Sequence, residues 1–446
     1  MKIAYKLLFK EKYFLFFFTT LAFDGLIRVL GYWTEISFLS FYKEIIFLIW
    51  ILIVLLGIII NNSNFSFPKA LILFMIFGLI VVLSIFVGLA QNNYESILIP
   101  IWGLKTSFFY FPILFFLHSS YYGTSEFYSK LANIISKIIP FIVLFGTLQF
   151  IFGSSILQTL AYPDKYEIIS LQYEGYFGDI RPIGTFRSAN DYGMFCLFSF
   201  ILLFYKYEKY RNRSTLLGFS FAFIGVISSL SKNNIIGLLI FLFFNYLIKN
   251  KKYNLMIKFK FVVPVMVFIL VTLINMKISS LDFNAIAIGD YDVFEYENSP
   301  TSTTAVRLLR WNANLNSFTN FSNMEMLFGS GYGNFGVGRS IGNLLEINNI
   351  SSDYFTIVDN NYILFLLNLG IFGVLVAFLI VKKYAKLFKM LLISQNEWHI
   401  KASFIFFLIL ISNAFFINVL ESFPGQIIIF MVLALPTVYS RHQKNF

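Results

Sequence analysis

Apolar segments long enough to cross a lipid bilayer recur along almost the whole chain of 446 residues. A helix needs about 20 apolar residues to cross ~30 Å of hydrocarbon. Twelve segments qualify, several of them short: residues 13–31, 41–60, 70–90, 101–118, 135–153, 190–205, 215–231, 234–248, 259–276, 356–381, 402–420 and 425–440. Hydrophobic residues make up 58% of the chain and charged residues 13%, so a water-soluble fold could not cover its apolar surface. The sequence predicts an all-α, polytopic integral membrane protein with about twelve transmembrane helices in one domain, residues 1–446.

Lysine and arginine residues gather in segments that twelve spans would place on a single side of the membrane. They are Lys2, Lys6, Lys10 and Lys12, then Lys206, Lys209, Arg211 and Arg213, then Lys249, Lys251, Lys252, Lys258 and Lys260, then Lys382, Lys383, Lys386 and Lys389, and finally Arg441 and Lys444. By the positive-inside rule this side is cytoplasmic, with both termini on it. The net charge of +11 then reflects topology, and we expect no nucleic-acid partner.

Two segments on the opposite side are too polar and too long to be simple connections. The first outer loop is residues 154–189, and the large outer loop, between the ninth and tenth spans, is residues 277–355. The first ends in two arginines, Arg181 and Arg187, followed by Asn190 and the purely apolar stretch 194–205. Two guanidinium groups fixed at the mouth of a span favour an anion site, since each offers several donors in a planar fork. Anchoring to lipid headgroups is the alternative.

The large outer loop carries a second arginine pair and a glycine run. Arg307 and Arg310 lie three residues apart in a segment with helical spacing, so their side chains share one face. Gly331 and Gly333 belong to the run 329–336, which alone is a weak signal and is equally typical of a plain flexible loop.

Charged residues at or inside the spans need separate interpretation. Asp359 precedes Asn360 at the start of the tenth span and is either a helix N-cap or a catalytic base. Asp24 and Arg28, four residues apart in the first span, are expected to pair with each other. Lys105 has no obvious partner in the sequence and would face either lipid headgroups or a phosphate ligand.

Taken in order along residues 140–380, these motifs resemble the O-antigen polymerase and O-antigen ligase superfamily. The resemblance is carried by residues 181–193, residues 228–234 with Ser231-Lys232, residues 307–311, the glycine run 329–336, and residues 359–364 with residues 369–373. It implies twelve spans, a large extracytoplasmic loop between late spans, and transfer of a glycan from a polyprenyl-pyrophosphate carrier without a metal or other cofactor. Partners implied are the lipid-linked oligosaccharide, membrane lipid, a chain-length regulator and a flippase.

The resemblance also assigns roles to individual residues. Arg181 or Arg187, together with Arg307 or Arg310, match the arginines that hold pyrophosphate. Independently of the resemblance, Asp359 could activate the acceptor hydroxyl as a general base. Asn190, Lys232, Gly331, Gly333 and Asn360 would contribute to substrate binding. The chain departs from the family in carrying Lys232 where many relatives have arginine, which loses the bidentate fork. It has Asp359-Asn360 where ligases have His-Asn, which favours a polymerase.

Several alternatives remain open at this point. Glu174, Asp179, Asp191 and Glu325 compete with Asp359 for the role of base, and Asp290 with Asp292 forms a pair that could hold a metal. A ligase that transfers the glycan to a lipid or protein acceptor uses the same donor. A flippase for the lipid-linked sugar is the alternative outside the enzymes, but it would place cations along a central cavity and have short outer loops.

Overall fold

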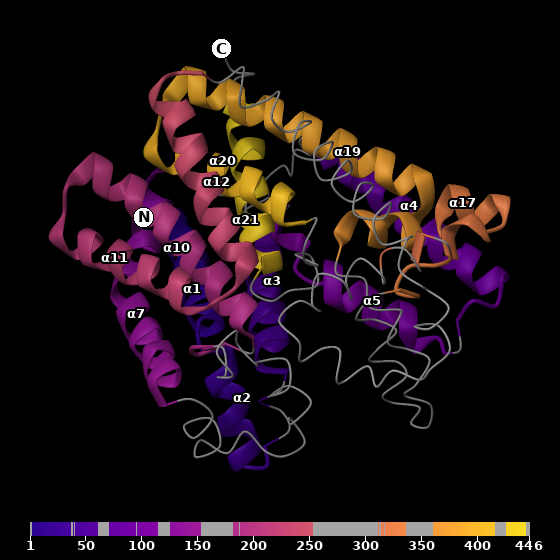
Figure 1. Cartoon of the computed structure of the whole chain (residues 1–446), viewed down its shortest axis with the longest axis horizontal. Coiled ribbons are helices and arrows are strands. Elements are labelled where there is room, and N and C mark those ends of the chain that lie inside the picture. Colours follow the sequence, from indigo (N-terminus) through magenta and orange to yellow (C-terminus); the bar gives the residue numbers. More distant parts are fainter. Residues whose placement is uncertain are drawn as a thin grey trace, which may run out of the picture.

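Every regular element in the described part of the chain is a helix. The computed structural model describes residues 2–36, 39, 41–60, 71–94, 96–114, 125–152, 182–186, 188–252, 311, 314–315, 317–335, 360–414 and 425–442. The helices, shown in Figure 1, are α1 (Lys2–Leu21), α2 (Asp24–Trp33), α3 (Tyr42–Ile60), α4 (Ile72–Ala90), α5 (Leu98–Phe108), α7 (Ser125–Phe152), α10 (Ala189–Tyr210), α11 (Arg213–Ser228), α12 (Lys232–Lys249), α17 (Asn323–Phe328), α19 (Asn361–Gln395), α20 (Trp398–Asn413) and α21 (Gly425–His442). The expected all-α class is confirmed for these residues.

Three of these helices, α4, α7 and α19, are long and apolar enough to cross a bilayer by themselves within the described ranges. The bent pair formed by residues 11–21 and 24–31 is a fourth candidate, and five shorter apolar helices accompany them. The predicted ninth span, 259–276, lies outside the described residues, as does most of the large outer loop.

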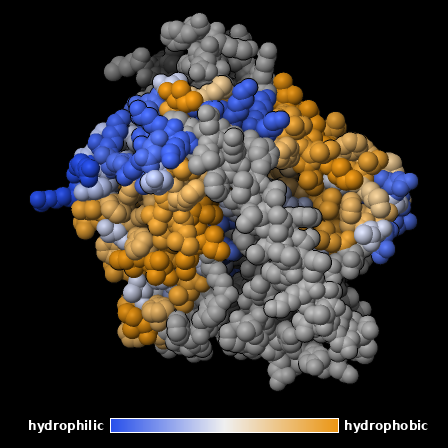
Figure 2. Space-filling view, turned by 45° about the horizontal axis from the view of Figure 1, so that its top comes forward, coloured by the Kyte–Doolittle hydropathy of each residue, from blue (hydrophilic) through white to orange (hydrophobic). Residues whose placement is uncertain are grey.

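The outward faces of these helices are apolar, as a lipid environment requires. Large hydrophobic side chains on α3, α4, α7 and α12 are more than half exposed: Leu52, Leu56, Ile59, Leu79, Phe86, Leu144, Ile151, Leu239 and Leu242. Figure 2 shows a broad hydrophobic surface bordered by a hydrophilic patch. Because soluble proteins rarely expose apolar patches of this extent, the surface is suited to contact with lipid tails.

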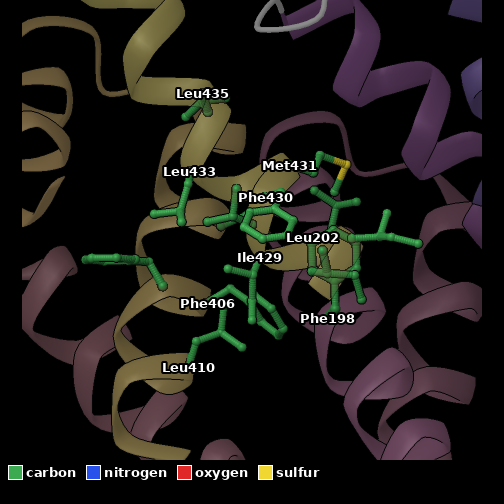
Figure 3. Packing of buried hydrophobic residues seen from close by; sticks show 14 of the residues in the cluster. Phe198, Leu202, Phe406, Leu410, Ile429, Phe430, Met431, Leu433 and Leu435 are labelled. Carbon is green, nitrogen blue, oxygen red and sulfur yellow. The ribbon is translucent and has the colours of Figure 1, made fainter. Parts of the chain in front are cut away.

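The helix α10 occupies the centre of the bundle. It contacts α7, α11, α12, α20 and α21, and its residues 191–203 are all buried. Figure 3 shows Phe198 and Leu202 of α10 packed against residues of α20 and α21, among them Phe406 and Phe430. The apolar stretch after Arg187 is therefore protein core.

The first predicted span, 13–31, is broken in the structure. The α1 helix ends at Leu21, and α2 leaves it at an angle of 72°. The Thr19 and Thr20 hydroxyls bond back to the carbonyls of Leu15 and Phe17, which offers the backbone local alternatives to the helical ladder. A continuous helix was wrongly predicted here because apolar residues continue through the bend.

The tenth span also differs from its predicted range. The α19 helix runs to Gln395, where Asn396 ends it in the left-handed conformation at φ +47°. Its 35 residues include a break at Gly370 and continue well past the predicted end at residue 381. The four lysines from Lys382 to Lys389, predicted to lie in a cytoplasmic loop, are therefore on the helix itself.

Opposite ends of the bundle carry different ion pairs and polar groups. One end, here called the basic end, holds the pairs Lys130–Glu11, Lys130–Glu126, Lys209–Glu397 and Lys249–Glu208. The other, here called the polar end, gathers the end of α1, the start of α3, the end of α7, and the starts of α10, α12 and α19. The ring contacts Phe14–Trp50 and Phe17–Phe47 show that α1 and α3 are antiparallel, so that the end of α1 and the start of α3 lie at the same end of the bundle.

Candidate functional site

The five residues between the two predicted arginines, residues 182–186, are fixed at the polar end of the bundle. The side chain of Gln149, near the end of α7, accepts hydrogen bonds from the backbone of Ile183 and Gly184 at 3.0 and 2.8 Å. Its amide donates to the carbonyl of Gly184 at 3.0 Å. A glutamine that satisfies three backbone groups holds this short segment in one conformation.

The same segment also packs into the bend between α1 and α2. The Thr185 hydroxyl donates to the carbonyl of Ala22, and the Gly25 amide donates to the carbonyl of Thr185 at 2.8 Å. A Cβ atom on Gly25 would clash with the Phe186 carbonyl, so glycine is required for this approach. The bend is thus stabilised by partners from the first outer loop. Arg181 and Arg187 flank this segment in the sequence but lie outside the described residues.

Asn190, in the first turn of α10, connects that helix to the start of α12. Its side-chain oxygen accepts a hydrogen bond from the Ser231 hydroxyl at 2.8 Å, and its backbone carbonyl accepts one from the Asn234 side-chain amide at 3.2 Å. Ser188 caps α10 by accepting from the Asp191 amide at 3.1 Å. Lys232 is the first residue of α12, and only its backbone is described. The predicted site residues Asn190 and Lys232 are therefore close together, where two helix N-termini meet.

Asn360 is the N-cap of α19. Its side-chain oxygen accepts from the amides of Tyr362 and Ile363 at 2.9 and 3.2 Å. The adjacent Asn361 amide donates to the carbonyl of Ala414 at 2.9 Å, which ties the start of α19 to the end of α20. The structure therefore assigns the cap to Asn360 and not to Asp359, the cap alternative raised above. Asp359 itself lies outside the described residues.

Two asparagines that were not predicted as site residues are buried near these helix ends. Asn234 and Asn413 are 0% and 2% exposed, and each has a buried side-chain oxygen without a hydrogen-bond partner among the described residues. The Asn413 amide nitrogen lies 3.7 Å from the position that a Cβ of Gly237 would occupy, so α12 and α20 meet there. Their signal in the sequence was an asparagine at the start of one predicted span and another inside a second, a residue that is costly to bury in a membrane protein.

Gly331 and Gly333 are buried between α4 and α5. A Cβ atom on Gly88 of α4 would lie 2.9 Å from the Gly331 Cα atom, and one on Gly103 of α5 would lie 2.6 Å from the Gly333 Cα atom. Both loop glycines have positive φ, at +118° and +88°. The alternative of a plain flexible loop is wrong for residues 329–335, since these glycines permit close backbone packing.

The loop of residues 329–335 also supplies hydrogen-bond partners at a break in α19. At Gly370 the helix has φ +64° and ψ −167°, which leaves nearby carbonyls without helical partners. The Ser330 amide donates to the Leu367 carbonyl at 2.9 Å, and the Ser84 hydroxyl donates to the Asn368 carbonyl. The Asn368 side chain bonds both the amide and the carbonyl of Phe335, at 3.0 and 3.1 Å. A broken helix in a membrane requires that its free backbone groups find hydrogen-bond partners within the protein, as these do.

The preceding helix, α17, is held by a capping box. Ser322 and Glu325 bond reciprocally, and the Asn93 amide donates to Glu325 at 2.7 Å. Burial alone would raise the pKa of Glu325, but the hydrogen bonds from Ser322 and Asn93 outweigh it and hold the pKa below its ordinary value. Glu325, an alternative candidate for the base, thus forms hydrogen bonds that stabilise α17 and its contact with Asn93.

The arginines of the large outer loop, Arg307 and Arg310, lie outside the described residues. Their neighbours Trp311 and Asn314 are described and helical, at 5% and 2% exposed. The rivals Glu174 and Asp179, and the pair Asp290 and Asp292, are also outside. Among the described residues, no group of three His, Cys, Asp or Glu side chains is placed to hold a metal ion.

A cluster of charged residues lies at the α1–α2 bend. Asp24, 1% exposed, pairs with Arg28 at 3.5 Å, as expected, and also with Lys43 of α3 at 3.6 Å. The Tyr42 hydroxyl donates to the same carboxylate at 3.1 Å. Lys105 does have a partner, Glu44 at 3.4 Å, which corrects the expectation of an unpaired lysine. This pairing could not be predicted from the sequence because α3 and α5 are far apart along the chain.

Comparison of the chain with protein-family models and with curated proteins finds no match.

Proposed function

We propose that this chain is a polysaccharide (O-antigen or capsule) polymerase that joins polyprenyl-pyrophosphate-linked oligosaccharide units at the outer leaflet. The observation that carries the proposal is the gathering of the described parts of four separate motifs at the polar end. Residues 182–186 pack beside α10, and Asn190 of α10 forms hydrogen bonds to the start of α12. The α12 helix contacts α20, and the end of α20 forms a hydrogen bond to the start of α19. The glycine loop then packs against α19.

The chemistry follows from the groups that these elements carry. A sugar linked to pyrophosphate has a good leaving group, so the protein must neutralise negative charge on phosphate oxygens and align the acceptor hydroxyl. The C1–oxygen bond to pyrophosphate breaks, the pyrophosphate leaves with the electron pair, and the acceptor oxygen bonds to C1. Arg181, Arg187, Arg307 and Arg310 stabilise the leaving group in this proposal, and Asp359 accepts the hydroxyl proton.

The capping of α19 supports the role given to Asp359. Because Asn360 already satisfies the first amides of the helix, the carboxylate of the preceding residue is not needed for that purpose. A carboxylate next to a helix N-terminus, at the mouth of a membrane helix, is a suitable acceptor for the proton of a sugar hydroxyl.

The proposal includes twelve spans with both termini in the cytoplasm of a bacterial inner membrane. It is supported by the alternation of the described helices between the basic end, with lysines 130, 209 and 249 in ion pairs, and the polar end. The positive-inside rule assigns the basic end to the cytoplasm. The motifs named above then face outward.

Deletion of the gene, followed by gel analysis of the surface glycan and of the lipid-linked pool, tests the proposal. A polymerase predicts that single repeat units accumulate on the carrier and that at most one unit reaches the surface. Full-length polymer retained on its carrier would identify a ligase instead. Lipid-linked units confined to the cytoplasmic leaflet would identify a flippase.

A further inference from the structure

One face of α19 carries two exposed lysines between exposed apolar side chains. The residues of this face follow one another at spacings of three and four, so they form a single stripe along the helix: Leu379, Lys382, Lys386, Met390 and Ile393. All five are exposed, the three apolar side chains at 44%, 38% and 61% in the order of the chain. The stripe is therefore a surface of the molecule that is both basic and apolar.

The two lysines lie where α19 passes the start of α4. The Ser84 hydroxyl of α4 donates to the Asn368 carbonyl beside the break in α19, whereas Phe74, in the first turn of α4, contacts the Tyr384 ring. Beyond the break, α19 therefore runs antiparallel to α4, which is long and apolar enough to cross a bilayer. The residues after Tyr384 extend past the start of α4, where a span of that length reaches the edge of the hydrocarbon layer.

The positive charge of this stripe is not compensated by the described part of the chain. The α19 helix contains four lysines and no aspartate or glutamate. Lys382 and Lys386 form no ion pair or hydrogen bond with any described residue. Glu397, the next acidic residue along the chain, pairs with Lys209 at 2.9 Å. An anionic group from outside the chain is thus free to approach both lysines.

The order of residues along the stripe favours a lipid surface as the partner. A helix that left the membrane for water would be polar beyond its lysines, but Met390 and Ile393 are exposed there. A helix face that combines lysines with apolar side chains is typical of a segment in the membrane interface. There the lysine ammonium groups reach the headgroups, and the apolar side chains enter the acyl boundary. Lysine clusters beside a membrane helix also attract anionic lipids.

We propose that the stripe from Leu379 to Ile393 lies in the membrane interface at the basic end, and that Lys382 and Lys386 bind the phosphate groups of anionic lipids there. The partner is the lipid surface of one leaflet, which the positive-inside rule assigns to the cytoplasm. The inference does not depend on polymerase activity, because contact with headgroups requires only the folded bundle in its membrane.

A thermal-shift titration of the full-length chain in neutral detergent with phosphatidylglycerol tests the role of the lysines. We expect saturable stabilisation of the wild type at low salt, which phosphatidylcholine does not reproduce. The variant Lys382→Gln/Lys386→Gln should show an apparent Kd at least about tenfold weaker, since each lysine near an anionic surface contributes roughly fivefold. Lys382→Arg/Lys386→Arg keeps both charges and should bind as the wild type does.

The matched control is Lys251→Gln/Lys252→Gln. It removes the same charge from two exposed lysines that follow α12, also at the basic end, but that do not belong to the α19 stripe. Its apparent Kd for phosphatidylglycerol should stay within about threefold of the wild type, because only long-range attraction is lost. An equal loss from both double variants would show a general attraction to the basic end, and would overturn a site on α19.

The position of the apolar residues needs a separate measurement. Ile393→Cys can be labelled with an environment-sensitive fluorophore, since Cys196 is buried. In nanodiscs that contain phosphatidylglycerol, this label should emit as in an apolar environment, and a label at Lys251→Cys as in water. Water-like emission from position 393, or equal affinity of the wild type and Lys382→Gln/Lys386→Gln, would overturn the inference. Apolar emission only with two chains in each disc would overturn it as well, by assigning the stripe to a second copy.

Discussion

The start of α19 shows what a single residue contributes to the account. The run Asp359-Asn360-Asn361 contains three residues that cap helices well, so the sequence alone could not choose among them. The structure assigns the cap to Asn360, whose side chain accepts from two amides. That choice depends on where the backbone enters the helix, which is set by contacts such as the Asn361–Ala414 bond. Asp359 is thereby separated from the capping role.

Substitutions at these two neighbouring positions should therefore have opposite consequences. Asn360→Asp keeps a capping oxygen and should preserve both stability and polymer, whereas Asn360→Ala should lower the unfolding free energy by about 1 kcal/mol. Asp359→Asn should leave the melting temperature unchanged and abolish polymer in a complementation assay, since an amide cannot accept the proton. Normal polymer from Asp359→Asn would remove this residue from the mechanism.

The arginines that flank residues 182–186 offer a second test at this scale. Arg187→Lys and Arg181→Lys keep the charge but lose the planar fork, so a pyrophosphate clamp predicts loss of polymer from either variant. Arg213→Lys is a suitable control, because Arg213 lies where α10 ends and α11 begins, away from the start of α10. This variant should leave polymer length unchanged. If both outer variants made normal polymer, the arginines would be headgroup anchors.

At the scale of elements, the glycine loop shows where sequence reasoning fell short. The glycines of the run 329–336 indicated a backbone free to adopt unusual conformations. The residues against which this backbone packs, Gly88, Gly103 and Gly370, lie in helices distant along the chain. Figure 1 shows α17 beside α4 and α19, and the loop follows α17 directly. Close backbone approach between elements depends on tertiary packing, which a local motif does not specify.

Two glycines of the same helix provide a matched test of this packing. A Cβ on Gly88 would lie 2.6 Å from the Tyr94 ring and 2.9 Å from the Gly331 Cα atom, whereas one on Gly78 would meet nothing within 4 Å. Gly88→Ala should therefore destabilise the protein by about 1–3 kcal/mol. Gly78→Ala should stay within ~1 kcal/mol of the wild type. Thermal unfolding in detergent measures both, and equal melting temperatures would contradict the close packing of the loop.

The capping box of α17 should make this region sensitive to acid. The pKa of Glu325 is lower in the folded state, so its carboxylate adds stability above its ordinary pKa, and that stability is lost as the pH falls through the folded-state value. We expect wild type to melt above Glu325→Gln at pH ~7, and the difference to shrink as the pH falls through the lowered pKa of the folded state. A difference in melting temperature that stayed constant with pH would show that the carboxylate charge contributes nothing.

Over the whole molecule, the apolar runs and the composition were sufficient to predict the all-α class of the described residues. They could not reveal the 72° bend at Ala22, because its carbonyl is satisfied by Thr185, a residue distant in the sequence. Nor could they place α10 at the centre, since a fully apolar helix is equally suited to lipid and to protein core. The arginines and Asp359, the core of the proposed chemistry, remain predictions from the sequence.

The orientation of the molecule can be tested with single cysteines, since Cys196 is buried and should not react. Asn92 and Lys251 are a matched pair: both are exposed, both follow a helix, and both have φ near +55°. Asn92→Cys should react with a membrane-impermeant maleimide in cells whose inner membrane is intact. Lys251→Cys should react only after that membrane is permeabilised. The reverse pattern would invert the topology and exclude an outer-face enzyme.

The most direct test of the polymerase proposal is reconstitution of the purified chain in proteoliposomes with the host's polyprenyl-pyrophosphate-linked repeat unit. We predict a ladder of lipid-linked glycans longer than one unit from the wild type, no ladder from Asp359→Asn, and a normal ladder from Asn360→Asp. If the wild type is folded and the substrate is accessible, single units that remain unextended would contradict the central claim.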